Sequence, residues 1–245
     1  MITLICITNN RISSLNELLI SASKNFDCVT QCIIVVNGIT RQAIEVDYSA
    51  LEVAGIGVVI EHRCKNSINF SEILIELRDM VVGSHVLWVT DSLILRKKSW
   101  EPSSPLDKST IYYISYEDGR DQCLRGNVSN NAINSGLLDL GFFTELGSCV
   151  FPAPEFFRSI SRGSLSLRYP QVDVLLDLCA SGVSVSHMAN LCRARSSTAR
   201  SYLLDHWSMG RDAFSIAFQD FRDMLLAHYN DSTVKTREYD MLRAM

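Results

Sequence analysis

The chain has no apolar run that approaches the roughly 20 residues required of a membrane-spanning helix. Its first eight residues also lack the basic region and the small-residue cleavage site of a secretory signal peptide. Hydrophobic residues make up 47% of the sequence and charged residues 20%, which is typical of globular proteins. We therefore expect a cytoplasmic protein, and 245 residues fit one large α/β domain or a domain with an appendage.

An excess of positive charge is absent as well. The formal net charge is −4, and the last 53 residues hold eight Lys and Arg against seven Asp and Glu, so that no basic tail is hidden there. Proteins that bind nucleic acid usually carry a basic patch or stripe. The sequence therefore predicts no nucleic-acid partner.

Several short motifs of metal and nucleotide sites are also missing. The eight cysteines include no C-x-x-C pair with the spacing of zinc ligands. No glycine-rich P-loop occurs, and no G-x-G-x-x-G follows the first predicted strand. A nucleotidyltransferase or a similar nucleotide-dependent α/β enzyme is therefore the least favoured of the candidate functions. Five cysteines lie in or beside apolar segments, and we expect them to be reduced core residues: Cys6, Cys32, Cys64, Cys149 and Cys179.

Two hydrophobic periods alternate over the first hundred residues. Apolar side chains recur at helical spacing over 14–23 and again over 71–82. Short apolar and β-branched runs separate and follow these helices, and they predict strands over 2–8, 32–36, 58–61 and 86–89. Such alternation predicts a mostly parallel, twisted sheet flanked by helices.

The second half of the sequence is less regular. A strand is predicted over 110–115, a helix over 172–181 and a short strand over 183–186. Between them, residues 117–135 are rich in Gly, Asn and Asp and predict a long surface connection, either a functional lid or a plain disordered segment.

A long amphipathic helix is predicted near the end of the chain, with an apolar stripe between 214 and 225. We expect this stripe to dock on the rest of the protein, and a partner or membrane helix is the alternative. The predicted organisation is an α/β domain over 1–192 with a helical C-terminal extension over 193–245 packed on it.

Asp91 is the most informative single residue, because it interrupts the apolar run over 86–95. Open α/β sheets bind ligands just outside the carboxyl ends of their strands, where phosphate and metal chemistry is usually done. The alternative is that Asp91 only starts a turn through side-chain to backbone hydrogen bonds. The segment alone leaves both interpretations open.

Four features follow one another in a particular order. The first strand ends in Thr8-Asn9-Asn10-Arg11, the second ends in Asn37-Gly38, Arg78 lies on the helix before the central strand, and Asp91 ends that strand. In this order they resemble a family-2-type glycosyltransferase with the GT-A fold. The resemblance implies a nucleotide-binding set: Thr8, Asn9, Arg11, Asn37, Gly38, Arg78 and Asp91.

Three later stretches extend the resemblance to roughly residues 1–225. Residues 147–157 resemble the segment that lines the donor-sugar and acceptor cleft, and residues 172–182 resemble the helix that opens with the general base. Residues 200–211 are similar to the basic aromatic stretch after the catalytic core. Each motif is short, and only their order makes the match specific.

The resemblance implies an inverting glycosyltransferase of the hexosyltransferase type. It would move a sugar from a nucleoside-diphosphate donor, expected to be UDP-linked, to a glycan, lipid-linked or protein acceptor. Such transfer requires a base for the acceptor hydroxyl and positive charge for the departing diphosphate. The implied base is Asp173, and the implied ligands of Mg²⁺ or Mn²⁺ are Asp91 and His187.

The sequence departs from the family pattern around Asp91. The family usually presents two or three acidic residues there, whereas Thr90 and Ser92 flank Asp91 in this chain. A strand-end Asp that commonly holds the nucleotide base is replaced by Val36. The second metal-binding carboxylate is therefore missing from the sequence.

A second departure concerns the general base. The expected Glu-Asp pair reads Pro170-Gln171 in one register, so that Asp173 comes two residues late. Asp173 also fits an ordinary first-turn helix carboxylate, and His187 an ordinary, partly buried histidine. The alternative function is a non-catalytic GT-A-like module that binds a nucleotide sugar or glycan, or that serves as a scaffold. Peripheral association with the inner face of a membrane and the oligomeric state stay open.

Overall fold

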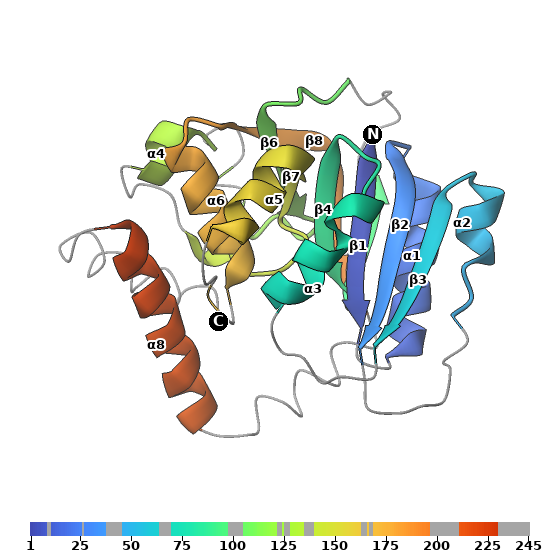
Figure 1. Cartoon of the computed structure of the whole chain (residues 1–245), viewed down its shortest axis with the longest axis horizontal. Helices are drawn as coiled ribbons and strands as arrows, with labels where there is room; N and C mark the ends of the chain where they lie inside the picture. The colour runs from blue at the N-terminus through green and yellow to red at the C-terminus, as the bar shows by residue number, and fades with distance from the viewer. Residues whose placement is uncertain are drawn as a thin grey trace.

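The fold is built on one mixed sheet of eight strands with helices on both of its faces (Figure 1). The computed structural model describes backbone and side chains for most of the chain, and the backbone alone for 211–217. The described residues are 1–8, 11–25, 27–37, 46–63, 70–97, 105–121, 124, 128–134, 140–162, 166, 169–196 and 211–229.

The first half of the chain alternates strands and helices, as predicted. Its elements are β1 (Ile2–Thr8), α1 (Ile12–Asn25), β2 (Val29–Asn37), α2 (Ser49–Val53), β3 (Gly57–Arg63), α3 (Phe70–Leu77), the short 3-10 helix η1 (Arg78–Met80) and β4 (His85–Thr90).

The second half contains shorter strands and the remaining helices. Its elements are β5 (Leu93–Lys97), β6 (Thr110–Tyr116), α4 (Asn130–Asn134), the 3-10 helix η3 (Leu140–Phe143), β7 (Cys149–Pro152), α5 (Ala153–Ser161), α6 (Pro170–Ala180), β8 (Ser184–Arg195) and α8 (Arg211–His228).

The strand order is β3-β2-β1-β4-β7-β6-β8-β5. Strands β3, β2, β1 and β4 run parallel to one another, and β6 runs parallel to β8. Strand β7 is antiparallel to β4 and β6, and β5 is antiparallel to β8. The predicted mostly parallel sheet flanked by helices is therefore confirmed, and the two antiparallel strands were not predicted.

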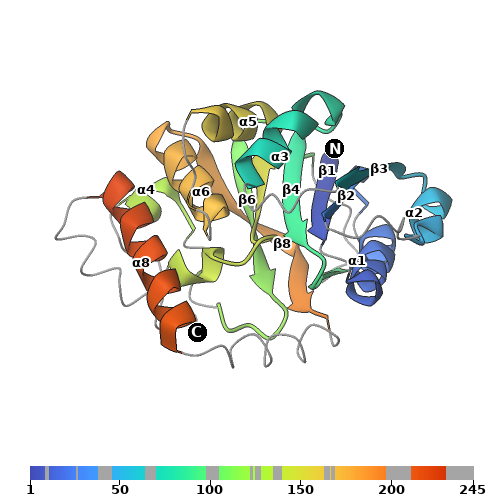
Figure 2. The same cartoon turned by 60° about the horizontal axis from the view of Figure 1, so that its bottom comes forward.

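Side chains of the central strands feed two hydrophobic cores because successive residues of a strand point to opposite faces. On β1, Ile5 and Ile7 join the core beneath α3, α5 and α6, while Leu4 and Cys6 join the core beneath α1. Figure 2 shows α1 and α2 on one side of the sheet and α3, α5 and α6 on the other. Burial on both faces explains the continuous apolar runs of β1 and β2.

Strand β8 is longer than the sequence predicted. The predicted strand over 183–186 is only the start of β8, which continues through an irregularity to Arg195 and pairs with β5. The sheet therefore ends at 195, three residues beyond the predicted domain boundary at 192. The division into a domain and a helical extension stays a prediction.

Helix α8 docks on the core through the stripe that the sequence predicted. Phe221, Met224 and Leu225 are buried in the same hydrophobic cluster as the apolar residues of α6. Within the described parts of the chain, no helix is both long and apolar enough to cross a membrane.

Four of the five cysteines expected in the core are described, and all four are buried thiols: Cys6, Cys32, Cys149 and Cys179.

Candidate nucleotide-binding site

Three strand ends meet at the carboxyl edge of the parallel part of the sheet. Thr8 ends β1, Asn37 ends β2, and Asp91 directly follows β4. The ends are level because Thr8 pairs with Val36 and Ile7 pairs with Thr90. Polar residues predicted to bind the nucleotide are therefore brought together where open α/β sheets place their ligands. Predicted residues Asn9 and Gly38 lie outside the described residues.

The Asp91 carboxylate is the centre of this edge and is completely buried. The Thr8 hydroxyl donates a hydrogen bond of 2.6 Å to its Oδ2. The Arg11 Nη2 atom lies 2.9 Å from its Oδ1, as an ion pair. Three of the predicted nucleotide-binding residues thus form one cluster, in which both carboxylate oxygens face a partner.

Burial governs the electrostatics of the cluster. It raises the pKa of Asp91, and the Thr8 hydrogen bond and the Arg11 charge offset only part of that rise. The Arg11 side chain is 33% exposed, whereas that of Asp91 is 0% exposed. The group that a ligand meets at this edge is therefore the guanidinium and not the carboxylate.

The predicted Mg²⁺ or Mn²⁺ site does not fit these residues. Within the described residues, no group of three or more His, Cys, Asp or Glu side chains is arranged to hold a metal ion. The hydroxyls that flank Asp91 bond to each other, Thr90 Oγ1 lying 2.8 Å from Ser92 Oγ. The second predicted ligand, His187, lies on β8 opposite Tyr113. The end of β8 reaches the Asp91 turn, where Arg195 pairs with Leu93, but His187 lies eight residues earlier, about 25 Å along the strand. The structure does not bring His187 to Asp91.

Arg78 lies at the opposite edge of the sheet. Its helical turn, η1, is fixed to the start of β2, where the Gln31 side chain donates to the Met80 carbonyl at 2.8 Å. The length of β4, six residues or about 20 Å, separates this edge from Asp91. The predicted contact of Arg78 with the nucleotide thus finds no support.

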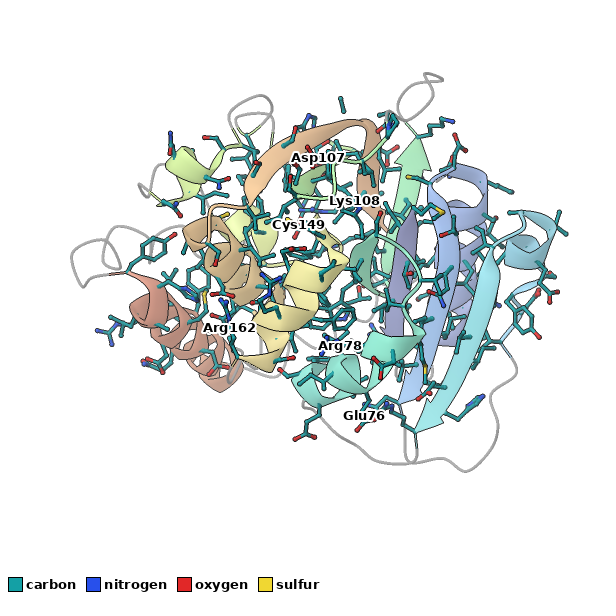
Figure 3. The ribbon with its side chains drawn as sticks, turned by 45° about the horizontal axis from the view of Figure 1, so that its top comes forward. Glu76, Arg78, Asp107, Lys108, Cys149 and Arg162 are labelled. Carbon is teal, nitrogen blue, oxygen red and sulfur yellow. The ribbon has the colours of Figure 1, made fainter. Side chains whose placement is uncertain are left out.

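At that far edge, Arg78 lines a groove of about 830 Å³ that runs along α5. Lys108 and Arg162 line it too. Figure 3 labels these two side chains together with Arg78. Two arginine charges in this region are paired: Arg158 with Glu155 at 3.7 Å, and Arg162 with Asp177 at 3.5 Å.

Asp173 lies in the first turn of α6 and is 8% exposed. Its Oδ1 is 2.7 Å from His228 Nε2 on α8, and its Oδ2 accepts a hydrogen bond of 2.5 Å from the Ser166 backbone N–H. Helix α6 packs against α4, α5, η3 and α8, on the side of the molecule away from β1 (Figure 1). These contacts indicate that Asp173 fixes α8 to α6.

Gln171 stands where one register of the family pattern expects the acidic base. It is buried, and its side-chain amide donates to the Thr144 carbonyl. An amide cannot accept the proton of an acceptor hydroxyl under ordinary conditions. The first turn of α6 therefore offers Asp173 as its one carboxylate, and that carboxylate already has two hydrogen-bond partners.

The segment predicted to line the cleft begins at the carboxyl edge. Gly147 adopts a φ of +91°, and a Cβ atom there would lie 2.5 Å from Leu93 Cδ2 and 3.2 Å from Val89 Cγ1. Val89 and Leu93 stand on either side of Asp91 in the chain, so Gly147 approaches the Asp91 turn closely. The other predicted stretch, 200–211, lies outside the described residues except for the backbone of Arg211.

A buried polar cluster beside β6 was not predicted from the sequence. Arg193 is fully buried, and its guanidinium donates to the Ile114 carbonyl at 2.6 Å and to the Phe142 carbonyl at 2.7 Å. Asp121 is also fully buried and accepts hydrogen bonds from the Tyr113 hydroxyl and the Tyr116 backbone N–H. The interpretation of 117–135 as a surface connection is therefore wrong at Asp121. Nothing in that polar stretch marks this aspartate as buried.

The comparisons with known proteins agree with this architecture. No protein-family model matches the sequence, and no curated protein matches it. Among solved structures, TarS of S. aureus gives a TM-score of 0.59 at 11% identity, over 98% of this chain and 42% of the TarS chain. This chain thus spans about two fifths of that protein.

Two shorter structures match over most of their length. TarS 1–349 in complex with UDP-GlcNAc gives a TM-score of 0.56 at 12% identity, over 99% of this chain and 72% of that one. The mannosyltransferase PcManGT from Pyrobaculum calidifontis, in complex with GDP-Man and Mn²⁺, gives 0.55 at 9% identity, over the same two shares. At identities this low, the similarity establishes the fold alone. The chain has the GT-A fold of these glycosyltransferases, as its sequence predicted.

Proposed function

We propose that this chain binds a nucleoside-diphosphate sugar at the carboxyl edge of its sheet and transfers the sugar to an acceptor hydroxyl. The observation that carries the proposal is the cluster of Thr8, Arg11 and Asp91 at the ends of β1 and β4. Structures with the same fold were solved with UDP-GlcNAc and with GDP-Man, which supports a donor of this class. We expect a UDP-linked sugar, and a glycan, lipid-linked or protein acceptor.

The transfer reaction sets two requirements. The acceptor oxygen attacks the anomeric carbon, and the bond from that carbon to the diphosphate oxygen breaks with its electron pair going to the diphosphate. Attack from the opposite side inverts the anomeric configuration. The site must therefore stabilise negative charge on the leaving diphosphate and take up the proton of the acceptor hydroxyl.

Arg11 is suited to the first requirement. Its guanidinium is always charged at neutral pH and offers planar N–H donors that match phosphate oxygens. It stands at the strand edge, a third exposed, above the buried Asp91. We assign it the stabilisation of the diphosphate, with the Thr8 and Asp91 contacts holding it in place.

The second requirement, uptake of the acceptor proton, is matched less well by the residues of this chain. Asp173 is the predicted proton acceptor, but its contacts with His228 and the Ser166 backbone favour a structural role. Gln171, at the alternative position, is an amide. These two observations favour the second candidate function, a non-catalytic module that binds a nucleotide sugar without transferring it.

Binding and turnover separate the two candidates. We would titrate UDP-GlcNAc, UDP-glucose and GDP-mannose into the chain and follow its thermal unfolding. A ligand at about 100 times its Kd stabilises a folded protein by roughly 2.7 kcal/mol. We expect one donor to bind, and Arg11→Ala to weaken that binding, whereas Arg96→Ala should not. Arg96, on β5, is a matched control because it forms an exposed ion pair with Glu117.

The bound donor is then tested for turnover by measuring release of its nucleoside diphosphate with mixed glycan acceptors. Release that depends on an acceptor supports the transferase. Binding without release in the presence of acceptors supports the non-catalytic module. Failure of every donor to bind the folded chain contradicts both candidates.

A further inference from the structure

On the basis of the proposed function, we infer that Arg11 supplies the positive charge of the diphosphate site from within the chain, so that donor binding requires no divalent metal ion. The inference starts from the donor atoms that the strand edge presents. A divalent ion such as Mg²⁺ or Mn²⁺ needs about six oxygen ligands, among which carboxylate oxygens carry most of the charge.

Asp91 cannot offer such an oxygen without rearrangement. Its side chain is 0% exposed, Oδ2 accepts the Thr8 hydrogen bond at 2.6 Å, and Oδ1 faces Arg11 Nη2 at 2.9 Å. A cation therefore already occupies the position opposite Oδ1, and that cation is the guanidinium. A metal ion at Asp91 would therefore have to displace Arg11 from this carboxylate.

The Arg11 guanidinium has the geometry to serve two partners. It carries five N–H donors in a fixed plane, and the contact with Asp91 is made through Nη2. One side of the group is thus held by a buried carboxylate, while a third of the side chain is exposed at the strand edge. Asp91 acts in this arrangement as a positioning residue, because it restricts the guanidinium before a phosphate arrives.

The start of α1 reinforces the charge of Arg11. The Arg11 carbonyl accepts a hydrogen bond of 3.0 Å from Leu15 N–H, so that Arg11 stands at the amino end of this helix. The first turn of α1 carries no acidic side chain. The positive end of the helix dipole therefore lies beside the guanidinium, and no acidic side chain of that turn offsets it.

The two sources of positive charge predict opposite effects of Asp91→Asn. If Asp91 binds a metal ion, loss of its charge removes the metal and weakens donor binding. If Arg11 provides the charge, Asp91→Asn leaves that charge uncompensated, while the asparagine oxygen still accepts a hydrogen bond. The variant should then bind a diphosphate at least as well as the native chain.

We would measure UDP and GDP binding by isothermal titration calorimetry, once with excess EDTA and once with MnCl₂. We expect the two affinities of the native chain to agree within about twofold. Arg11→Ala should bind the diphosphate about tenfold or more weakly in both buffers, and should bind uridine or guanosine unchanged. Asp91→Asn should bind in EDTA within about threefold of the native chain, or more tightly. Arg96→Ala serves as the control, and circular dichroism checks each fold.

Each outcome separates the inference from the proposed function. Binding that requires Mn²⁺ overturns the inference and leaves the proposed function standing. Loss of binding in a folded Asp91→Asn variant also overturns the inference. Absence of binding by the native chain in either buffer overturns the proposed function itself. The comparison of EDTA with Mn²⁺ uses the native chain, so it holds even if Arg11→Ala does not fold.

Discussion

Thr8 shows at the scale of one residue how the strand edge is held. Its hydroxyl is buried and donates to Asp91 Oδ2. We expect Thr8→Val to lower the free energy of unfolding by about 1–3 kcal/mol, because a buried carboxylate oxygen loses its donor. Urea unfolding measures the change.

Thr30 on the adjacent strand β2 provides a matched control. Its Oγ1 is buried, and the described residues offer it no hydrogen-bond partner. Thr30→Val should therefore leave the free energy of unfolding nearly unchanged. Equal losses in the two variants would mean that the hydrogen bond from Thr8 contributes nothing specific.

The raised pKa of Asp91 predicts a pH dependence. Burial places that pKa above its ordinary value of 3.8, so the folded chain holds the proton more tightly than the unfolded chain. The contribution of Asp91 to stability is therefore fully present below the unfolded pKa, and is lost as the pH rises through the folded pKa. Asp91→Asn does not titrate. Its stability relative to the native chain should rise as the pH increases from about 3 to about 7.

The pKa of Asp118 is shifted in the opposite direction, which predicts a pH dependence of opposite sign. The Arg120 hydrogen bond lowers its pKa, and its contribution is therefore present above the unfolded pKa and lost as the pH falls. Relative to the native chain, Asp118→Asn should lose stability as the pH rises, by a small amount since the carboxylate is 53% exposed. Parallel urea titrations at several pH values test both signs. The same slope for both variants would contradict the assignment.

Site residues at strand ends could be placed from the sequence, whereas a candidate site residue on a helix could not. Thr8, Arg11 and Asp91 could be predicted because parallel strands end at one edge, and each residue lies at or just after a strand end. Arg78 could not, because the height of a helical residue along the sheet depends on where its helix begins and ends. Here α3 gives way to η1 beside the start of β4.

At the scale of elements, the contact between Asp173 and His228 joins α6 to α8. If its role is structural, Asp173→Asn and His228→Ala should each lower stability, and a double-mutant cycle should give a coupling of about 1 kcal/mol. Hydrogen exchange should also show faster opening of α8 in both variants. Asp223→Asn is the control, since its exposed carboxylate accepts a hydrogen bond from Gln219 of the same helix.

The alternative role of Asp173 gives a different pattern. A general base contributes about 10²- to 10⁴-fold to the rate. A loss of that size in kcat, with the unfolding free energy and the exchange of α8 unchanged, would establish Asp173 as the base and reject the structural role.

Elements were predicted well where a strand is buried on both faces. The runs of β1, β2 and β4 are continuous because helices cover both sides of the parallel sheet. Strand β5 was hidden, because only Asp91 and Ser92 separate it from β4 and the two strands read as one apolar run. The four residues of β7 are too short to show a period of their own.

For the whole molecule, the burial of α8 decides whether the predicted C-terminal extension is a separate unit. Phe221 is 0% exposed and packs edge-on against Tyr169, with ring centroids 5.2 Å apart. It belongs to the core cluster that also contains residues of β1, β2, β4 and α6. We therefore expect the described fold to unfold in one cooperative transition, since one core is shared by the sheet and α8.

Phe221→Ala should lower the free energy of unfolding by about 3–5 kcal/mol while the transition stays single. Tryptophan fluorescence and far-ultraviolet circular dichroism, followed together in urea, test this expectation. Trp88 is buried in the same cluster and reports on the sheet, whereas circular dichroism weights the helices. If the circular dichroism of Phe221→Ala falls at lower urea than its fluorescence, α8 unfolds before the sheet, and the helical extension is an independent unit.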